Sequence, residues 1–260
     1  KSGLADYLIQ DCVNIFFILF EFIDNCYKAL RNTDNKNIEI YNNSNELIVK
    51  DNGIGIKQKD IDKILNHFLR HDNNKTSLSV YGLGLKQSIY CFIKRNGGSG
   101  FIISSSLNKK NEKLYILVSL KLDSNNWLQY KIINISQETI DTFKNIIKDT
   151  GTLIYLTKKN VENLDDDDLI DKVIDIIQNI NNFNIEDSDI DKTNIDLIQK
   201  LYANIINENV NIKYNNKKLI SDHFIKDTDK VLFDINIQLS NCQKYFYIPL
   251  VDICYYKKSP

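Results

Sequence analysis

Three polar side chains interrupt an apolar helical pattern near the start of the chain. Residues 4–31 carry apolar side chains at helical spacing, and Glu21, Asn25 and Lys28 stand within this pattern at positions i, i+4 and i+7. This spacing places a carboxylate, an amide and an ammonium group on one helix face, where they could point together into a cavity. A solvated stripe on an amphipathic helix has the same spacing, so the pattern alone leaves both interpretations open.

A second polar site follows the apolar run at residues 47–49. The sequence DNGIGI at residues 51–56 places Asp51 at the end of a predicted strand, with Gly53 and Gly55 directly after it. Alternate glycines allow a sharp turn and let a ligand approach the backbone closely. A buried carboxylate needs a partner, and a ligand with an N–H donor would provide one. Asp-Asn-Gly is also a common turn sequence, so a plain turn is the alternative.

A third glycine pair precedes another apolar helix. The sequence YGLGLKQS at residues 81–88 runs into the apolar residues 89–93. Backbone N–H groups at the positive end of a helix dipole suit a phosphate, and Lys86 adds positive charge there. The P-loop spacing is absent. The dinucleotide-binding pattern G-x-G-x-x-G is incomplete, because Gln87 occupies its last glycine position.

The elements that would position these residues alternate between strands and helices. Period-2 patterns predict strands and helical periodicity predicts helices. The strands are expected at residues 38–41, 46–50, 101–105, 114–122, 127–133 and 151–157, and the helices at residues 57–68, 136–148 and 169–180. Residues 71–80 form a polar segment of lid length between two glycine sites. We therefore expect an α+β sandwich, with a mixed sheet covered by helices on one face.

Composition excludes some classes of function. The chain has 260 residues and a formal net charge of -1, which gives no bulk electrostatic reason to expect nucleic acid or an anionic membrane. Five scattered cysteines form no C-x-x-C pair, so we expect neither a disulfide framework nor a zinc site. The apolar stretch at residues 12–22 is interrupted well short of the ~20 residues that a membrane span needs. We expect an intracellular protein, cytoplasmic or nuclear, with no membrane partner.

Four short blocks together resemble the GHKL superfamily of ATPases, which includes the gyrase B subunit, MutL, the ninety-kilodalton heat-shock chaperone and the sensor histidine kinases. The blocks are E-x-x-D-N at residues 21–25, D-x-G-x-G at residues 51–55, G-x-G-L-K at residues 82–86, and Gly-Thr at residues 151–152. They occur in the order of the family and cover about the first 160 residues. The resemblance favours the functional interpretation of all three polar sites.

The resemblance implies a Bergerat-type fold with an ATP and Mg²⁺ site. In such a site Asp51 accepts a hydrogen bond from the adenine amino group, Asn25 binds the metal, and Glu21 is the general base, with Lys86 as a second catalytic candidate. The remaining nucleotide-binding candidates are Gly53, Gly55, Ile56, Gly82, Leu83, Gly84, Leu85 and Thr152.

The resemblance also implies domains and partners. Residues 1–160 would form the ATP-binding domain, residues 161–194 a helix and linker, and residues 195–260 the start of a smaller transducer-like α/β domain. The sequences YGLGLKQS and residues 201–218 look most similar to Microrchidia (MORC) ATPases and related bacterial proteins. Slow ATP hydrolysis, closure of the lid, ATP-dependent homodimerisation and DNA as a candidate cargo are then expected. Lys217, Lys218 and Lys226 are candidates for a transducer lysine.

Glu21 separates the alternatives within the superfamily. ATPase members carry a carboxylate at this position, whereas histidine kinases usually carry asparagine or another residue that is not acidic. Hydrolysis needs a base close to the attacking water, and transfer to a separate histidine domain does not. Phosphotransfer in the manner of a histidine kinase, or an ATP-sensing scaffold that does not hydrolyse, are the two alternatives to an ATPase.

Overall fold

The fold is a single mixed β-sheet with helices on both faces. The computed structural model describes residues 15–65, 84–94, 98–123, 128–158, 166–180 and 189–221. Its strands are β1 (Lys36–Asn42), β2 (Glu46–Asp51), β3 (Ser99–Leu107), β4 (Lys113–Leu122), β5 (Leu128–Ile133), β6 (Gly151–Thr157), β7 (Val210–Tyr214) and β8 (Lys217–Lys218). Its helices are α2 (Ile15–Ala29), the 3-10 helix η1 (Gln58–Asp60), α3 (Ile61–Leu65), α4 (Gly84–Lys94), α5 (Gln137–Ile146), α6 (Asp166–Gln178), α7 (Asp189–Leu201) and α8 (Ala203–Asn207).

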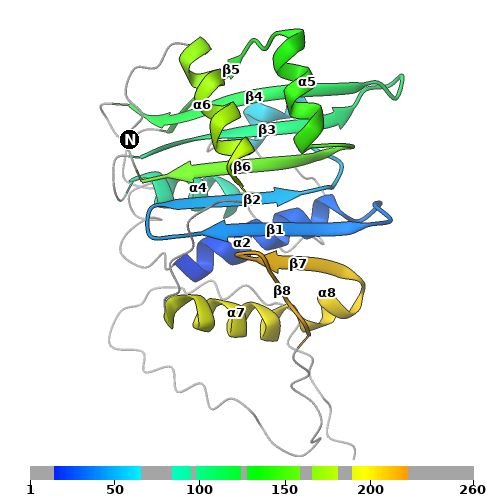
Figure 1. The fold of residues 1–260 in the computed structure, drawn as a ribbon, viewed down its shortest axis with the longest axis vertical. Helices are drawn as coiled ribbons and strands as arrows, with labels where there is room; N and C mark the ends of the chain where they lie inside the picture. The colour runs from blue at the N-terminus through cyan, green and yellow to red at the C-terminus, as the bar shows by residue number, and fades with distance from the viewer. Residues whose placement is uncertain are drawn as a thin grey trace, which may run out of the picture.

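The eight strands follow the order β5-β4-β3-β6-β2-β1-β7-β8 (Figure 1). The β1–β7 pair is parallel and the other neighbouring pairs are antiparallel. Insertion of β6 between β2 and β3 brings residue 152 into register with residue 51, so two blocks that are distant in sequence become neighbours. The predicted α+β class with a mixed sheet is confirmed.

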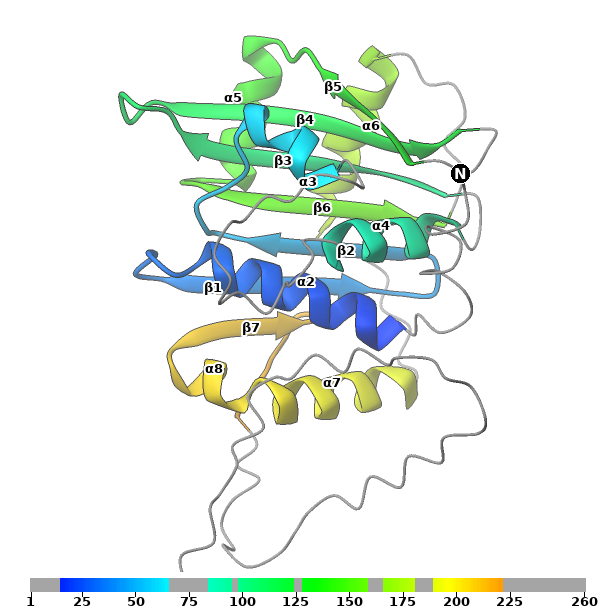
Figure 2. The same ribbon diagram turned by 180° about the vertical axis from the view of Figure 1, so that it is seen from behind.

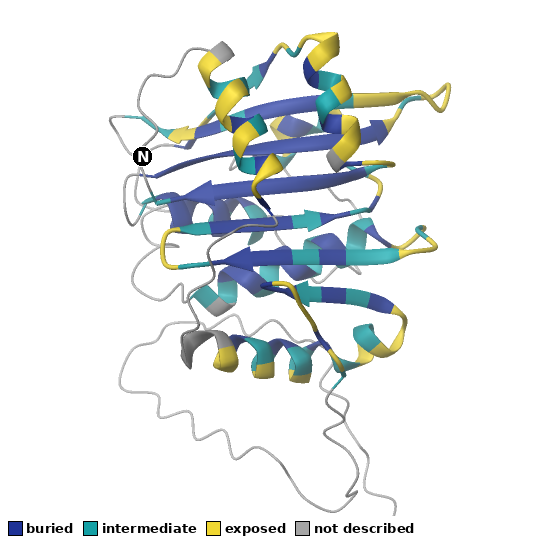
Figure 3. Ribbon diagram, viewed as in Figure 1, coloured by how far each residue is buried: buried dark blue, intermediate teal, exposed yellow. Residues whose placement is uncertain are grey.

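Helices on both faces correct one detail of the sequence-based expectation. Figure 2 shows α2, α3 and α4 on one face of the sheet, and Figure 1 shows α5 and α6 on the other. Each face has its own apolar core, because strand side chains alternate. Ile38 and Ile40 of β1 face α2, whereas Tyr41 and Ile48 belong to the cluster that includes Phe143 of α5. The central strands β3 and β6 are buried almost throughout, since both of their faces are covered (Figure 3).

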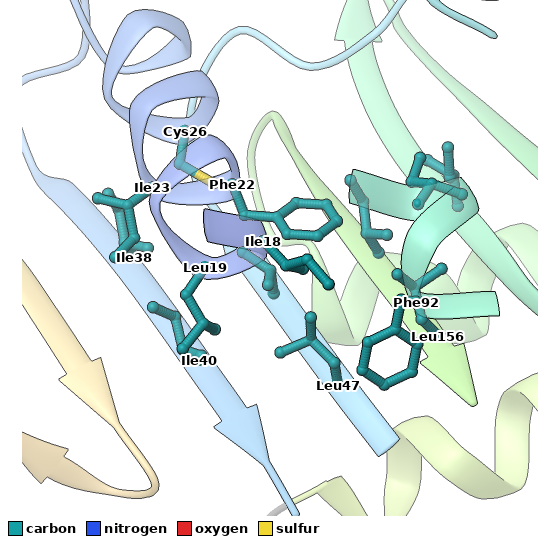
Figure 4. Close-up of a cluster of buried hydrophobic side chains, with 14 of the residues drawn as sticks. Ile18, Leu19, Phe22, Ile23, Cys26, Ile38, Ile40, Leu47, Phe92 and Leu156 are labelled. Carbon is teal, nitrogen blue, oxygen red and sulfur yellow. The ribbon is translucent and has the colours of Figure 1, made fainter. Parts of the chain in front are cut away.

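The core beneath the candidate site is formed by α2 and α4 against the sheet. Leu19, Phe22 and Ile23 of α2 are almost fully buried. They lie against strand residues that include Ile38, Ile40 and Leu47 (Figure 4). The apolar side of α2 therefore fixes the rotation of the helix and sets the direction of the E-x-x-D-N block.

The expected domain boundary after residue 194 does not separate two sheets. β7 pairs in parallel with β1, and the alternating residues Val210, Ile212 and Tyr214 join the same core as Ile38 and Ile40. Alternation predicts a half-buried strand, but it does not indicate which sheet the strand joins. Alternating residues also predict strands at residues 231–239 and 245–253 in the rest of the expected transducer-like unit, and these lie outside the described residues.

Candidate functional site

The carboxylate of Asp51 lies buried at the end of β2. The residue is 7% exposed, and its Oδ1 accepts a hydrogen bond from the N–H of Gly53 at 2.8 Å. Burial raises the pKa of Asp51 to about 6, although the N–H of Gly53, the thiol of Cys26 and the N–H of Thr152 all favour the charged form. The three donors stabilise the charge only in part. A ligand donor would stabilise the ionised carboxylate further.

The glycine turn after Asp51 is wedged between α2 and β3. A Cβ at Gly53 would come within 2.6 Å of the Ala29 carbonyl oxygen, which also accepts from the N–H of Ile54 at 3.1 Å. Gly55 has a φ of +69°, and a Cβ there would overlap the carbonyl of Ser105. The alternate glycines are therefore required by close backbone packing as well as by the turn.

Ser104 connects the turn to the Gly-Thr block. Its hydroxyl accepts from the N–H of Ile56 at 2.7 Å and donates to the carbonyl of Gly151 at 2.8 Å. The Ser104 and Thr152 hydroxyl oxygens are 3.0 Å apart. Because a serine hydroxyl has one proton, Thr152 is the donor of this second bond. The Ser104 hydroxyl thus links Ile56 and Thr152 beside Asp51.

Glu21 lies against the beginning of α4. A Cβ added at Gly84 would overlap the Glu21 carboxylate, so the absence of a side chain at Gly84 makes room for this group. The pKa of Glu21 is raised to about 7, chiefly by burial and to a smaller extent by the negative charge of Asp24, while Lys28 acts in the opposite direction. The structure thus brings the first and third sequence blocks together. A carboxyl group that titrates near neutrality is suited to general base catalysis.

Asn25 is oriented by its own helix. Its side-chain N–H donates to the backbone carbonyl of Glu21, one turn earlier in α2. The amide oxygen is the atom that would bind a metal, and Mg²⁺ accepts oxygen ligands and is often bound by one or two protein groups together with substrate phosphates. Among residues with described positions, no cluster of three or more His, Cys, Asp or Glu side chains could hold a metal ion. A single amide oxygen such as that of Asn25 is compatible with a magnesium ion whose other ligands include substrate phosphates.

The remaining predicted site residues fall into three groups. Leu85 packs partly into the apolar core, and Lys86 is 2% exposed in the first turn of α4, where burial lowers its pKa. Gly82, Leu83 and the lid at residues 71–80 lie outside the described residues. Of the transducer candidates, Lys217 and Lys218 form β8 at the sheet edge, and Lys226 lies outside the described residues.

Sequence reasoning missed three residues beside the site: Cys26, Ser104 and Tyr202. Ser104 could have been found, because residues 104–106 are three serines that directly follow the apolar residues 101–103 of a predicted strand. The thiol of Cys26 is fully buried, and its hydrogen bond to Asp51 contributes to the raised pKa of the thiol, after burial and the Asp51 charge. The sequence gives no indication that Tyr202, which lies between α7 and α8, contacts α2.

Comparison with known proteins agrees with this geometry. Residues 10–123 match the model of the family described as histidine kinase-, DNA gyrase B-, and HSP90-like ATPase. The chain carries a GHKL-type domain. This match and the mixed sheet with helices are consistent with the Bergerat-type fold that the sequence predicts.

Two individual proteins are similar to parts of the chain. Sensor protein RprX of Bacteroides fragilis (strain YCH46) is 29% identical over 119 residues, which cover 40% of this chain and 23% of that protein. A crystal structure of the N-terminal domain of a DNA repair protein matches with a TM-score of 0.39 and 17% identity, over 76% of this chain and 46% of the other. The chain therefore spans less than half of either relative. No helix among the described residues is long and apolar enough to cross a membrane.

Proposed function

We propose that this GHKL domain binds Mg·ATP and hydrolyses it slowly, with Glu21 as the general base. The buried Asp51 is the observation that carries the proposal, because a carboxylate at the end of a buried strand is suited to accept from the adenine amino group. The adjacent glycine turn and the Ser104–Thr152 pair would form the adenine end of the site. The backbone around Gly84 and the Lys86 ammonium would contact the phosphates at the start of α4.

The proposed reaction is transfer of the γ-phosphoryl group to water. Water attacks the γ-phosphorus, Glu21 takes the proton from that water, and the bond between the γ-phosphorus and the bridging oxygen breaks to give ADP and phosphate. Mg²⁺, held by Asn25, would neutralise charge on the phosphate oxygens. Glu21 is positioned for this role by α2, with its carboxylate at the positive end of the α4 dipole.

Release of phosphate from γ-labelled ATP tests the proposal. We expect the parent chain to release free phosphate, and Glu21→Gln to bind ATP with unchanged affinity but lose about 10²–10⁴-fold in rate. Glu138→Gln is the matched control, because Glu138 is an exposed carboxylate on α5, on the opposite face of the sheet. If Glu21→Gln releases phosphate at the parent rate, Glu21 is not the base.

The same experiment distinguishes a second candidate function. The similarity to a sensor protein favours phosphotransfer as the alternative. Phosphate that stays covalently on the protein would support phosphotransfer, whereas free phosphate supports the ATPase. ATP bound without either product would support a nucleotide-sensing scaffold.

A further inference from the structure

Three polar side chains form a row across the sheet at the proposed adenine end of the site. Asp51 of β2 and Ser104 of β3 are both in register with Thr152, which lies between them on β6. Val49 and Ile154, two residues along β2 and β6, belong to the core beneath α2. Because side chains alternate along a strand, the row lies on the α2 face of the sheet.

The hydroxyl of Ser104 is fully used by hydrogen bonds within the protein. It accepts from the N–H of Ile56 at 2.7 Å, donates its one proton to the carbonyl of Gly151 at 2.8 Å, and lies 3.0 Å from the Thr152 hydroxyl oxygen. Ser104 can therefore only accept from Thr152. Since Ser104 is fully buried, no water competes for these bonds. The proton of the Thr152 hydroxyl is thus directed toward β3.

The Thr152 hydroxyl oxygen keeps its lone pairs for another partner. Within the described part of the chain, no group donates to this oxygen. Its neighbour in the row is the carboxylate of Asp51, which is also an acceptor. The N–H groups of Gly53 and Ile56 already donate to Asp51 and Ser104. Asp51 and Thr152 therefore both offer acceptors to a ligand.

Two adjacent acceptors distinguish between purine bases. Adenine carries an amino donor at position 6, whereas guanine and hypoxanthine carry a carbonyl acceptor there. A carbonyl that faces two acceptors leaves buried polar groups unpaired, which weakens its binding. A threonine hydroxyl that rotates freely can donate to such a carbonyl. Discrimination at this position therefore depends on whether the Thr152 hydroxyl is held in one direction.

We propose that Ser104 is a positioning residue that fixes the Thr152 hydroxyl as an acceptor toward the base. In this way Ser104 raises the preference for a base with an amino group over one with a carbonyl. The inference rests on the proposed binding of a nucleotide with its base at Asp51. Ser104 acts through Thr152 and does not itself contact the base, because its own proton and lone pairs are occupied.

Calorimetric affinities for ADP and IDP, both with Mg²⁺, test the inference. IDP differs from ADP in having a carbonyl in place of the amino group at position 6. We expect the ratio of ADP affinity to IDP affinity to fall about tenfold in Ser104→Ala, the factor that one hydrogen bond provides. Ser105→Ala is the matched control, because Ser105 is equally buried and donates to the carbonyl of Asp149 at 3.1 Å, but lies on the opposite face of β3.

Thr152→Val shows whether Ser104 acts through Thr152, and it also serves as the test if Ser104→Ala unfolds the chain. Valine has the shape of threonine without the hydroxyl, so the ratio should fall in this variant too. Adding Ser104→Ala to Thr152→Val should then cause no further fall. The inference would be overturned by an unchanged ratio in either single variant, by an equal fall in Ser105→Ala, or by a further fall in the double variant.

An NMR measurement without nucleotide separates this inference from the proposed function. The Thr152 hydroxyl proton should give its own signal in the parent chain, because burial and hydrogen bonding slow its exchange with water. The signal should be lost in Ser104→Ala and kept in Ser105→Ala, and a signal that persists in Ser104→Ala would overturn the inference. A folded parent chain that binds neither nucleotide would refute the proposed function, while this signal would still decide the direction of the Thr152 hydroxyl.

Discussion

At the scale of single residues, the site depends on carboxylates that are costly to bury. Asp51 is the clearest case, because three donors surround it and its pKa still lies at about 6, above the ordinary value of 3.8. A group of this kind lowers the stability of the free protein at neutral pH. This loss of stability is understandable if the ionised carboxylate binds a ligand.

The stability cost of Asp51 gives a prediction. The pKa of Asp51 is higher in the folded state than in the unfolded state. The contribution of Asp51 to the free energy of unfolding is therefore fully favourable below about pH 4 and is lost as pH rises through about 6. Asp51→Asn removes this titration while keeping the shape of the side chain. We expect the variant to be more stable, with a free energy of unfolding about 1–3 kcal/mol higher than that of the parent at pH 7.5.

Urea denaturation of both proteins at pH 7.5 and pH 4.5 measures this effect. The advantage of Asp51→Asn should shrink at the lower pH, where the parent carboxyl group is largely protonated. An advantage that is equal at both pH values would show that the titration of Asp51 is not its cause.

At the scale of elements, the sequence predicts local secondary structure better than it predicts which elements contact each other. The hairpin of β1 and β2, the meander of β3 to β5 and the strand β6 follow from alternation and turn residues, and the structure confirms them. Which strands become neighbours depends on long-range packing, which alternation does not encode. For the same reason Asp51 could be identified from its place after an apolar strand, whereas Tyr202 could not.

The two faces of the sheet should respond differently to loss of core volume. Phe143 of α5 is fully buried on the face opposite to the site, and Phe22 of α2 is equally buried on the site face. Either change to Ala should lower the free energy of unfolding by about 3–5 kcal/mol. Phe22→Ala should also weaken ATP binding, because Phe22 supports the helix that carries Glu21 and Asn25.

Phe143→Ala should leave the affinity of the folded protein for ATP unchanged. Denaturation and nucleotide titration, performed below the unfolding temperature of both variants, measure the two effects. An equal loss of affinity in both variants would contradict the assignment of the site to the α2 face.

At the scale of the whole molecule, one continuous sheet joins the GHKL domain to the segment that follows it. β7 extends the sheet beyond β1, and the α7–α8 corner contacts α2. We propose that this continuity lets nucleotide binding affect how two copies associate. The lid at residues 71–80 and DNA as cargo remain predictions from family resemblance.

Light scattering tests the proposed association. We expect a monomer without nucleotide and a dimer with Mg²⁺ and a non-hydrolysable ATP analogue, because a ligand that binds the closed state better shifts the population toward it. Glu21→Ala should accumulate the dimer with ATP itself. A mass that is unchanged in both proteins would contradict an ATP-gated dimer.

The most direct measurement of the central claim is a calorimetric titration of the chain with a non-hydrolysable ATP analogue, with and without Mg²⁺. The account predicts saturable binding to the parent chain that is stronger with Mg²⁺. It also predicts loss of this binding in Asp51→Asn. The denaturation experiment would show that this variant is folded. Absence of binding to the folded parent chain, or parent affinity in Asp51→Asn, would contradict the claim that Asp51 receives the adenine of ATP.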